Sequence, residues 1–304
     1  LRAARRIDDT RCMLAYRHAF HAGNHADVLK HIVLQRTLAL LQKKDKGLRI
    51  VDTHAGAGGY ALDSRYAQKR AEFEDGIGRL WALKQAARPG APAFPPAIEP
   101  LVTPYLDAVQ AFNPEGKLQQ YPGSPAFEQR WMRPQDELRL FELHTTDHKI
   151  LSSWLGEARG VQVHDRDGFE SLKSQLPPPT RRGLILMDPS YEGDADYTRV
   201  LTSLREALTR FPEAVVMVWY PIVQKVQARE LPRRLQGLAS RSWLDARLTV
   251  ALSDERGFGL QGSGMFVVNP PFTLEDELQA LLPWLATTLA QVDEPAWLVN
   301  AHRV

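Results

Sequence analysis

The feature that most constrains the fold of this chain is a set of short apolar segments, each ending at an acidic residue. These are residues 48–51 before Asp52, 138–141 before Glu142 and 184–187 before Asp188. Helical patterns separate most of the predicted strands, and strands that alternate with helices indicate a parallel, doubly wound sheet. The carboxyl ends of parallel strands share one edge of the sheet, where open α/β sheets bind their ligands. We therefore predict an α/β fold with a binding site at that edge.

Seven strands are expected in this sheet. Besides the three above, we predict strands at residues 161–163, 215–219, 244–252 and 265–268. No helical pattern separates the last two, so they should form an antiparallel pair at one edge of a mostly parallel sheet.

The alternation is interrupted over residues 61–121. Two helical stretches there flank residues 88–96, a proline-rich link that neither a helix nor a strand would tolerate. We predict that residues 61–121 form a small inserted helical subdomain, and that residues 13–60 and 122–304 form the Rossmann-like domain. Residues 1–12 are basic and lack apolar periodicity, so we expect a disordered or non-native N-terminal extension.

The composition excludes several classes of protein. Of 304 residues 44% are hydrophobic, which is ample for a buried core. One cysteine, Cys12, allows no intramolecular disulfide framework. No apolar run approaches the roughly 18–20 residues that span a bilayer, so we expect a cytoplasmic protein.

Histidines and basic residues raise two further possibilities. The spacing of the four N-terminal histidines places no three on one helical face, so we expect no metal. The net charge of +2 does not by itself indicate a nucleic-acid partner. Several arginines could contact phosphates or form solvated faces, and both interpretations stay open: Arg181, Arg182, Arg229, Arg233, Arg234 and Arg241.

A glycine turn follows the first of the predicted strands. Asp52 is separated by three residues from Gly56, and Gly58 follows. Glycines at this position let the backbone approach a nucleotide-like ligand. The pattern also fits the dinucleotide fingerprint, but an acid at the strand end suits S-adenosylmethionine better, because that molecule is cationic and carries no pyrophosphate.

Two further strand ends carry acids with a possible binding role. Glu142 could accept the hydroxyl groups of a ribose, and Asp167 could accept an adenine amino group with Phe169 packed nearby. Each acid alone could equally cap a helix.

The most informative segment is Asp188-Pro189-Ser190-Tyr191, which resembles the (D/N)-P-P-(Y/F) motif of amino methyltransferases. The side-chain oxygen of Asp188 and the carbonyl of Pro189 can accept both hydrogens of an exocyclic amino group, and Tyr191 offers a stacking face. The motif has proline where this chain has Ser190, but neither acceptor is lost. A second copy, residues 269–272, is interpreted as a strand end and a helix start.

Five sequence blocks together are very similar to the bacterial large-subunit rRNA adenine-N6 methyltransferase J family. The blocks are residues 13–31, 52–58, 121–125, 181–186 and 283–285. The resemblance implies a class I S-adenosylmethionine-dependent methyltransferase fold with an inserted helical subdomain. It also implies a monomer that methylates one adenine of 23S rRNA free of ribosomal proteins.

Transferred position by position, the resemblance assigns Asp188 as the catalytic carboxylate and Tyr16 as a contact to the substrate adenosine. The implied cofactor-binding residues are His31, His54, Ser124, Glu142, Asp167 and Gly168. Gly56, in the glycine turn, is a further candidate for cofactor binding. Lys30 is a candidate partner for the methionine carboxylate of the cofactor.

We therefore expect methyl transfer from S-adenosylmethionine to N6 of an adenine in 23S rRNA. The alternatives are a DNA adenine-N6 methyltransferase, which would need a target-recognition domain, and a non-catalytic nucleotide- or RNA-binding α/β module.

Overall fold

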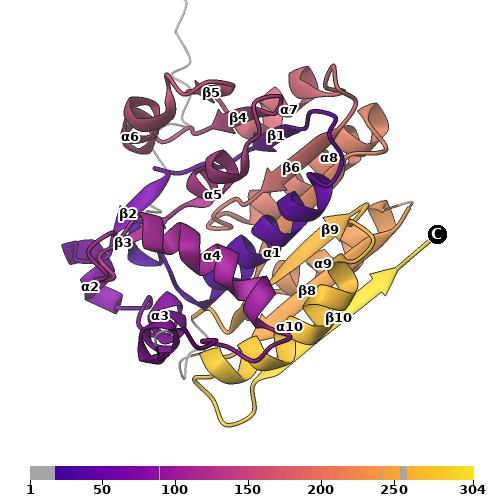
Figure 1. Ribbon diagram of the computed structural model, residues 1–304. Coiled ribbons are helices and arrows are strands. Elements are labelled where there is room, and N and C mark those ends of the chain that lie inside the picture. The colour runs from indigo at the N-terminus through magenta and orange to yellow at the C-terminus, as the bar shows by residue number, and fades with distance from the viewer. Residues whose placement is uncertain (1–17, 89, 240, 254–258) are drawn as a thin grey trace, which may run out of the picture.

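The computed structural model describes residues 18–88, 90–239, 241–253 and 259–304. Its centre is an eight-stranded sheet in the order β10-β8-β9-β7-β6-β1-β4-β5 (Figure 1). Five strands are parallel: β1 (Arg49–Asp52), β4 (Glu137–Phe141), β5 (Val161–His164), β6 (Gly183–Met187) and β7 (Val215–Ile222). Each neighbouring pair among β7, β9 (Gly262–Val268), β8 (Trp243–Thr249) and β10 (Ala296–His302) is antiparallel.

This topology confirms the Rossmann-like fold of class I S-adenosylmethionine-dependent methyltransferases. One detail of the prediction was wrong, because the sheet has eight strands and not seven. β10 pairs with the outer side of β8, so the antiparallel pair of β8 and β9 lies inside the sheet and not at its edge. The sequence of β10 gave no strand signal because most of its residues are exposed and no buried face alternates with a polar one.

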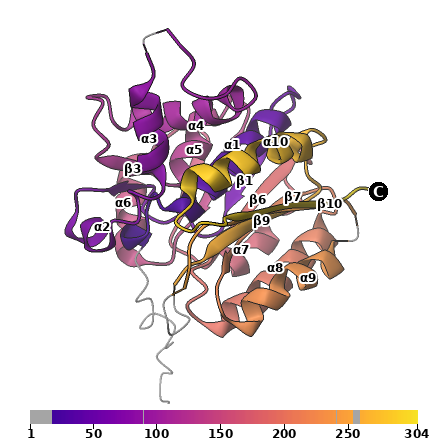
Figure 2. The ribbon, with the colours of Figure 1, turned by 90° about the horizontal axis from the view of Figure 1, so that it is seen from below.

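Helices cover both faces of the sheet and bury two separate cores (Figure 2). One face carries α1 (His25–Leu41), α4 (Glu99–Ala111), α5 (Ser124–Trp131), α6 (Thr145–Leu155) and α10 (Leu274–Leu289). The other carries α7 (Gly168–Gln175), α8 (Asp194–Arg210) and α9 (Val226–Leu238).

Helix α1 is central to the first core. Asn24 caps it, accepting hydrogen bonds from the backbone N–H groups of Ala26 and Asp27 at 3.0 Å. The helix is buried almost all round, because it lies between the sheet, α4, α5 and α10. Its polar residues Asp27 and Lys30 are therefore held in the interior, where each needs a partner.

The residues between β2 (Gly59–Ala61) and β3 (Gln120–Pro122) contain α2 (Arg65–Arg70), α3 (Ile77–Ala86) and α4. β2 and β3 pair with each other in a small antiparallel sheet, so the two ends of this stretch lie together. Residues 61–121 are thus largely helical, while their status as a separate subdomain stays a prediction. Residues 1–12 lie outside the described residues. No helix within the described ranges is long and apolar enough to cross a membrane.

Candidate functional site

A pocket of about 640 Å³ opens at the carboxyl edge of the sheet. Every predicted site residue that the structure describes lines it: Lys30, His31, His54, Gly56, Ser124, Glu142, Asp167, Gly168, Asp188, Pro189 and Tyr191. Tyr16, the predicted contact to the substrate, lies outside the described residues. Strand ends and α1 thus bring together side chains that are far apart in the sequence.

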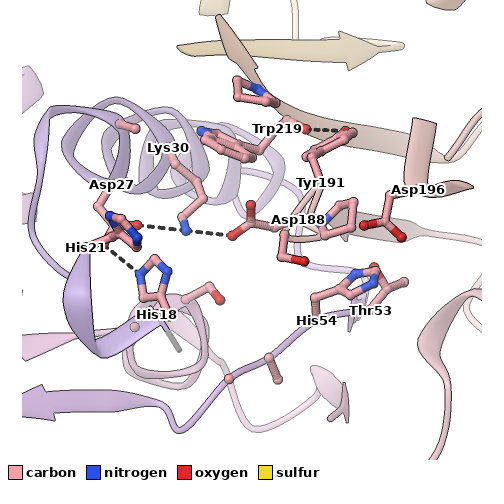
Figure 3. A pocket seen from close by; sticks show the side chains of 18 of the residues that line it. His18, His21, Asp27, Lys30, Thr53, His54, Asp188, Tyr191, Asp196 and Trp219 are labelled. Atoms are coloured by element: carbon pink, nitrogen blue, oxygen red, sulfur yellow. Dashed lines mark hydrogen bonds and ion pairs between the residues drawn. The ribbon is translucent and has the colours of Figure 1, made fainter. Parts of the chain in front are cut away.

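A buried ion pair links α1 to the end of β6 (Figure 3). Lys30 Nζ lies 2.6 Å from Asp188 Oδ2 and 2.8 Å from Asp27 Oδ1. Burial lowers the pKa of Lys30, but the two carboxylates outweigh burial and raise this pKa above the ordinary value. Burial raises the pKa of Asp188 above its ordinary value, and the Lys30 ammonium offsets only part of this rise. Lys30 is therefore engaged with carboxylates of the chain, and its contact with a cofactor stays a prediction.

Asp27 was not anticipated from the sequence as part of the site. Its side chain is 2% exposed, and its Oδ2 accepts hydrogen bonds from His18 Nε2 at 2.8 Å and from the backbone N–H of Gly23 at 2.9 Å. Although burial opposes it, the charges of His18 and Lys30 hold the pKa of Asp27 well below the usual range. The available signal was the spacing of three residues between Asp27 and Lys30, which places both on one helix face.

The loop after β6 carries the predicted motif. Tyr191 has a φ of 53°, a left-handed conformation that is uncommon for a bulky residue. Its hydroxyl donates a hydrogen bond to the carbonyl of Trp219 at 2.7 Å, and its ring lies 4.7 Å from that of Tyr197. Tyr191 and Trp219 therefore form an aromatic wall beside Asp188 (Figure 3). Trp219 was predicted only as a strand residue.

The glycine turn after β1 is tied to the neighbouring strand ends. Glu142 Oε2 accepts a hydrogen bond from the backbone N–H of Gly56 at 2.7 Å. Burial raises the pKa of Glu142. Ser124 Oγ donates to Asp52 Oδ2 at 2.6 Å, and burial raises the pKa of Asp52 to about 7. Asp52 lies behind the lining and supports the turn.

Asp167 both caps a helix and forms an ion pair. Its Oδ1 accepts a hydrogen bond from the backbone N–H of Glu170 at 3.2 Å, as an N-cap of α7, and its Oδ2 lies 2.5 Å from Arg199. The guanidinium of Arg199 lies 4.9 Å from the ring centre of Phe169. His54 packs edge-on against the same ring at 4.6 Å. Both interpretations of Asp167 from the sequence therefore stay open.

Two features of the lining suit a bound ligand. His31 Nδ1 lies 2.8 Å from the hydroxyl of Tyr121, while its buried Nε2 has no hydrogen-bond partner among the described residues. At Gly168 a Cβ atom would lie 2.1 Å from the carbonyl oxygen of Thr53, so this close approach requires glycine. Within the described ranges, no three His, Cys, Asp or Glu side chains are arranged to hold a metal ion.

Comparison with known proteins gives consistent matches. The family model described as Ribosomal RNA large subunit methyltransferase D, RlmJ, matches residues 45–300. The Ribosomal RNA large subunit methyltransferase J of Escherichia coli (strain K12) is 41% identical over 277 residues, covering 91% of this chain and 94% of that protein. The protein of the same name from Haemophilus influenzae is 40% identical over 290 residues, covering 95% and 98%.

A solved structure is also similar. The crystal structure of protein LPL1258 from Legionella pneumophila superposes with a TM-score of 0.81 at 33% sequence identity, covering 92% of this chain and 98% of that one.

Proposed function

This chain belongs to the RlmJ family of ribosomal RNA large subunit methyltransferases, and from that premise we propose that it methylates N6 of an adenine in 23S rRNA with S-adenosylmethionine as donor. One observation supports the reaction more than any other. The buried pair of Lys30 and Asp188 stands at the start of the Asp-Pro-Ser-Tyr loop, in the same pocket as the strand-end acids.

The residues of the pocket fit S-adenosylmethionine. Glu142 at the end of β4 suits the hydroxyls of a ribose, and the Asp167–Gly168 turn at the end of β5 suits an adenine. The unpaired Nε2 of His31 offers a polar contact to the methionine part. When bound, this cofactor supplies an electrophilic methyl group.

Asp188 is the group we assign to the target amine. Lys30 Nζ donates a hydrogen bond to Oδ2 of Asp188. Within the described part of the chain, Oδ1 of Asp188 has no hydrogen-bond partner. Oδ1 and the carbonyl of Pro189 can therefore accept the two hydrogens of the adenine amino group. These acceptors turn the nitrogen lone pair away from the ring and toward the cofactor. They also stabilise the positive charge that develops on the nitrogen during transfer more than they stabilise the ground state.

Lys30 has a positioning role in this scheme. Its ammonium, held between Asp27 and Asp188, fixes the rotamer of Asp188 and favours the ionised form of this carboxyl against the rise in pKa that burial causes. An ionised carboxylate accepts hydrogen bonds only, as the amino group requires. The proton that the nitrogen loses after transfer can leave through the same carboxylate.

The aromatic wall of Tyr191 and Trp219 offers a face on which the target adenine can stack. A target nucleotide must leave its stack to reach a pocket of this kind. Stacking on an aromatic face is worth about 1–3 kcal/mol per base, which offsets part of the free energy of unstacking. In line with the family resemblance, we further propose a monomer that acts on RNA free of ribosomal proteins.

The choice of substrate is tested by competition. Equimolar protein-free 23S rRNA and DNA of the same sequence are incubated together with the enzyme and labelled S-adenosylmethionine. Label in the RNA alone supports the proposal. Label in the DNA would establish the DNA adenine methyltransferase instead, and label in neither, with intact cofactor binding, would favour the non-catalytic module.

A further inference from the structure

Helix α9 begins at the mouth of the pocket and carries a stripe of basic side chains away from it. Lys225, the N-cap residue of α9, lines the pocket. Arg229 and Arg233 follow at intervals of four residues, so the three side chains share one face of the helix. All three are exposed, while Ala228, Leu231 and Leu235 pack against the sheet. We call Lys225, Arg229 and Arg233 the basic stripe.

Positive charge is concentrated on this helix. Residues 225–238 contain four cationic side chains, those of the basic stripe and Arg234, and one carboxylate, Glu230. Their net charge of +3 exceeds the +2 of the whole chain. The remainder of the protein is thus close to neutral, and α9 differs from it in charge.

The three arginines of α9 have no side-chain partner among the described residues. In the part of the chain that the structure describes, the side chains of Arg229, Arg233 and Arg234 form no ion pair, hydrogen bond or ring contact. Lys225 lies 3.7 Å from Asp194. By contrast, Arg36 binds Glu277 at 2.8 Å. The guanidinium groups of the α9 arginines, unlike that of Arg36, are therefore available to bind an external anion.

The direction of α9 fits a polymer that enters the pocket. β7 ends at the carboxyl edge, and α9 returns along the outer surface of the sheet beside α8 (Figure 2). Four residues of helix rise about 6 Å, so the basic stripe extends about 12 Å from Lys225. A single small ligand in the pocket could not reach Arg233, whereas a nucleic-acid strand could pass each cation in turn.

We propose that the basic stripe binds successive phosphates of the RNA strand that flanks the target adenine. This inference rests on the proposed function, since it takes RNA as the substrate. Phosphate contacts position a strand without reading its sequence. The stripe would therefore set the register of the RNA at the pocket, and the pocket itself would select adenine.

The test compares two variants with equal loss of charge. Arg229→Gln/Arg233→Gln removes two members of the stripe. Lys43→Gln/Lys44→Gln removes two exposed lysines after the end of α1, on the opposite edge of the sheet. The dissociation constant of a labelled single-stranded RNA oligonucleotide is measured over a range of salt concentrations for both variants and the wild type. For a single strand, each lost phosphate contact reduces the slope of log K against log salt by about 0.7.

For the arginine variant, which lacks two contacts, we expect this slope to be smaller by about 1.4 and RNA binding to be at least about tenfold weaker near 0.1 M salt. The lysine variant should bind RNA like the wild type, and both variants should keep the wild-type affinity for S-adenosylmethionine, which reports an intact pocket. The Michaelis constant for 23S rRNA should rise in the arginine variant only.

Unchanged RNA affinity and slope in the arginine variant would overturn the inference, and so would an equal loss in the lysine variant. In either case a wild-type enzyme that still methylates RNA leaves the proposed function standing. If the wild type neither binds nor methylates RNA, the proposed function fails, and the inference fails with it.

Discussion

The ammonium of Lys30 lies 2.6 Å from Oδ2 of Asp188, and this contact joins α1 to the loop after β6. Both side chains are largely buried, with exposed fractions of 5% and 14%. An isolated buried charge is unfavourable, so each member depends on the other. The pair therefore connects the stability of the fold with the ionisation state of the proposed catalytic group.

The pH dependence of kcat/KM in the Lys30→Met variant tests this connection. Lys30 lowers the pKa of Asp188, so its removal lets burial raise that pKa further. Asp188 must be ionised to accept the amino hydrogens, and the acidic limb of the kcat/KM profile should move to higher pH. Activity at neutral pH should fall and recover partly in alkaline buffer. An unmoved acidic limb would contradict the role of Lys30, provided that circular dichroism and a cooperative thermal transition show a folded variant.

Asp27→Asn should destabilise the protein in a pH-dependent manner. The pKa of Asp27 is depressed in the folded state from a usual value of 3.8, so its ionisation stabilises the fold above that pH. Its loss also leaves Lys30 with one partner, and removing a member of a buried pair costs about 3–5 kcal/mol. Urea unfolding at neutral pH should show the difference from wild type. The difference should shrink as pH falls below about 4, where Asp27 of the unfolded chain takes up a proton, and it should vanish only below the lower pKa of Asp27 in the folded state. A pH-independent difference would count against this account.

Gly168→Ala should weaken the cofactor site. The new Cβ would lie 2.1 Å from the backbone of Thr53, so α7 must move away from β1 and carry Asp167 with it. We expect lower stability and at least tenfold weaker binding of S-adenosylmethionine by calorimetry. The matched control is Gly237→Ala on α9, where, apart from the adjacent backbone of the helix itself, no atom lies within 4 Å of the new Cβ. This control should be neutral or stabilise by up to about 1 kcal/mol. Equal behaviour of both variants would argue against the close approach.

Ser190→Pro restores the motif that this chain resembles. Both proposed acceptors, Asp188 Oδ1 and the Pro189 carbonyl, are kept. Proline at a compatible position stabilises by about 0.4–1 kcal/mol, since it restricts the unfolded chain. We expect a small rise in Tm and a kcat within a few-fold of wild type. A large loss of kcat would show that Ser190 itself takes part.

The location of the site was predictable from the sequence, because the carboxyl ends of parallel strands meet at one edge of the sheet. The contacts that helix residues make in the site were not predictable in this way. Asp188, Glu142 and Asp167 each follow a strand, so the fold class alone brings them to a common pocket. The strand pattern carries no information on the partners that helices contribute. The sequence pattern indicates only that Asp27 lies in the first turn of a helix and that Arg199 lies in a helix. Only their positions in three dimensions place them against Lys30 and Asp167.

The strand β10 and the place of Trp219 in the pocket were missed for different reasons. β10 is an exposed edge strand and has no buried face to produce a pattern. Trp219 was correctly predicted within a strand, but which residue of a strand turns toward a pocket depends on how the neighbouring loop closes. Here that loop is fixed by the hydrogen bond from Tyr191 to the Trp219 carbonyl.

Transfer of labelled methyl to protein-free 23S rRNA by wild type and Asp188→Ala, followed by nucleoside analysis, tests the central claim most directly. Binding of S-adenosylmethionine by both proteins serves as the control for folding. We predict that N6-methyladenosine forms with the wild type and is reduced at least about 100-fold in the variant. Label in another nucleoside, or undiminished N6-methyladenosine with Asp188→Ala, would contradict the account.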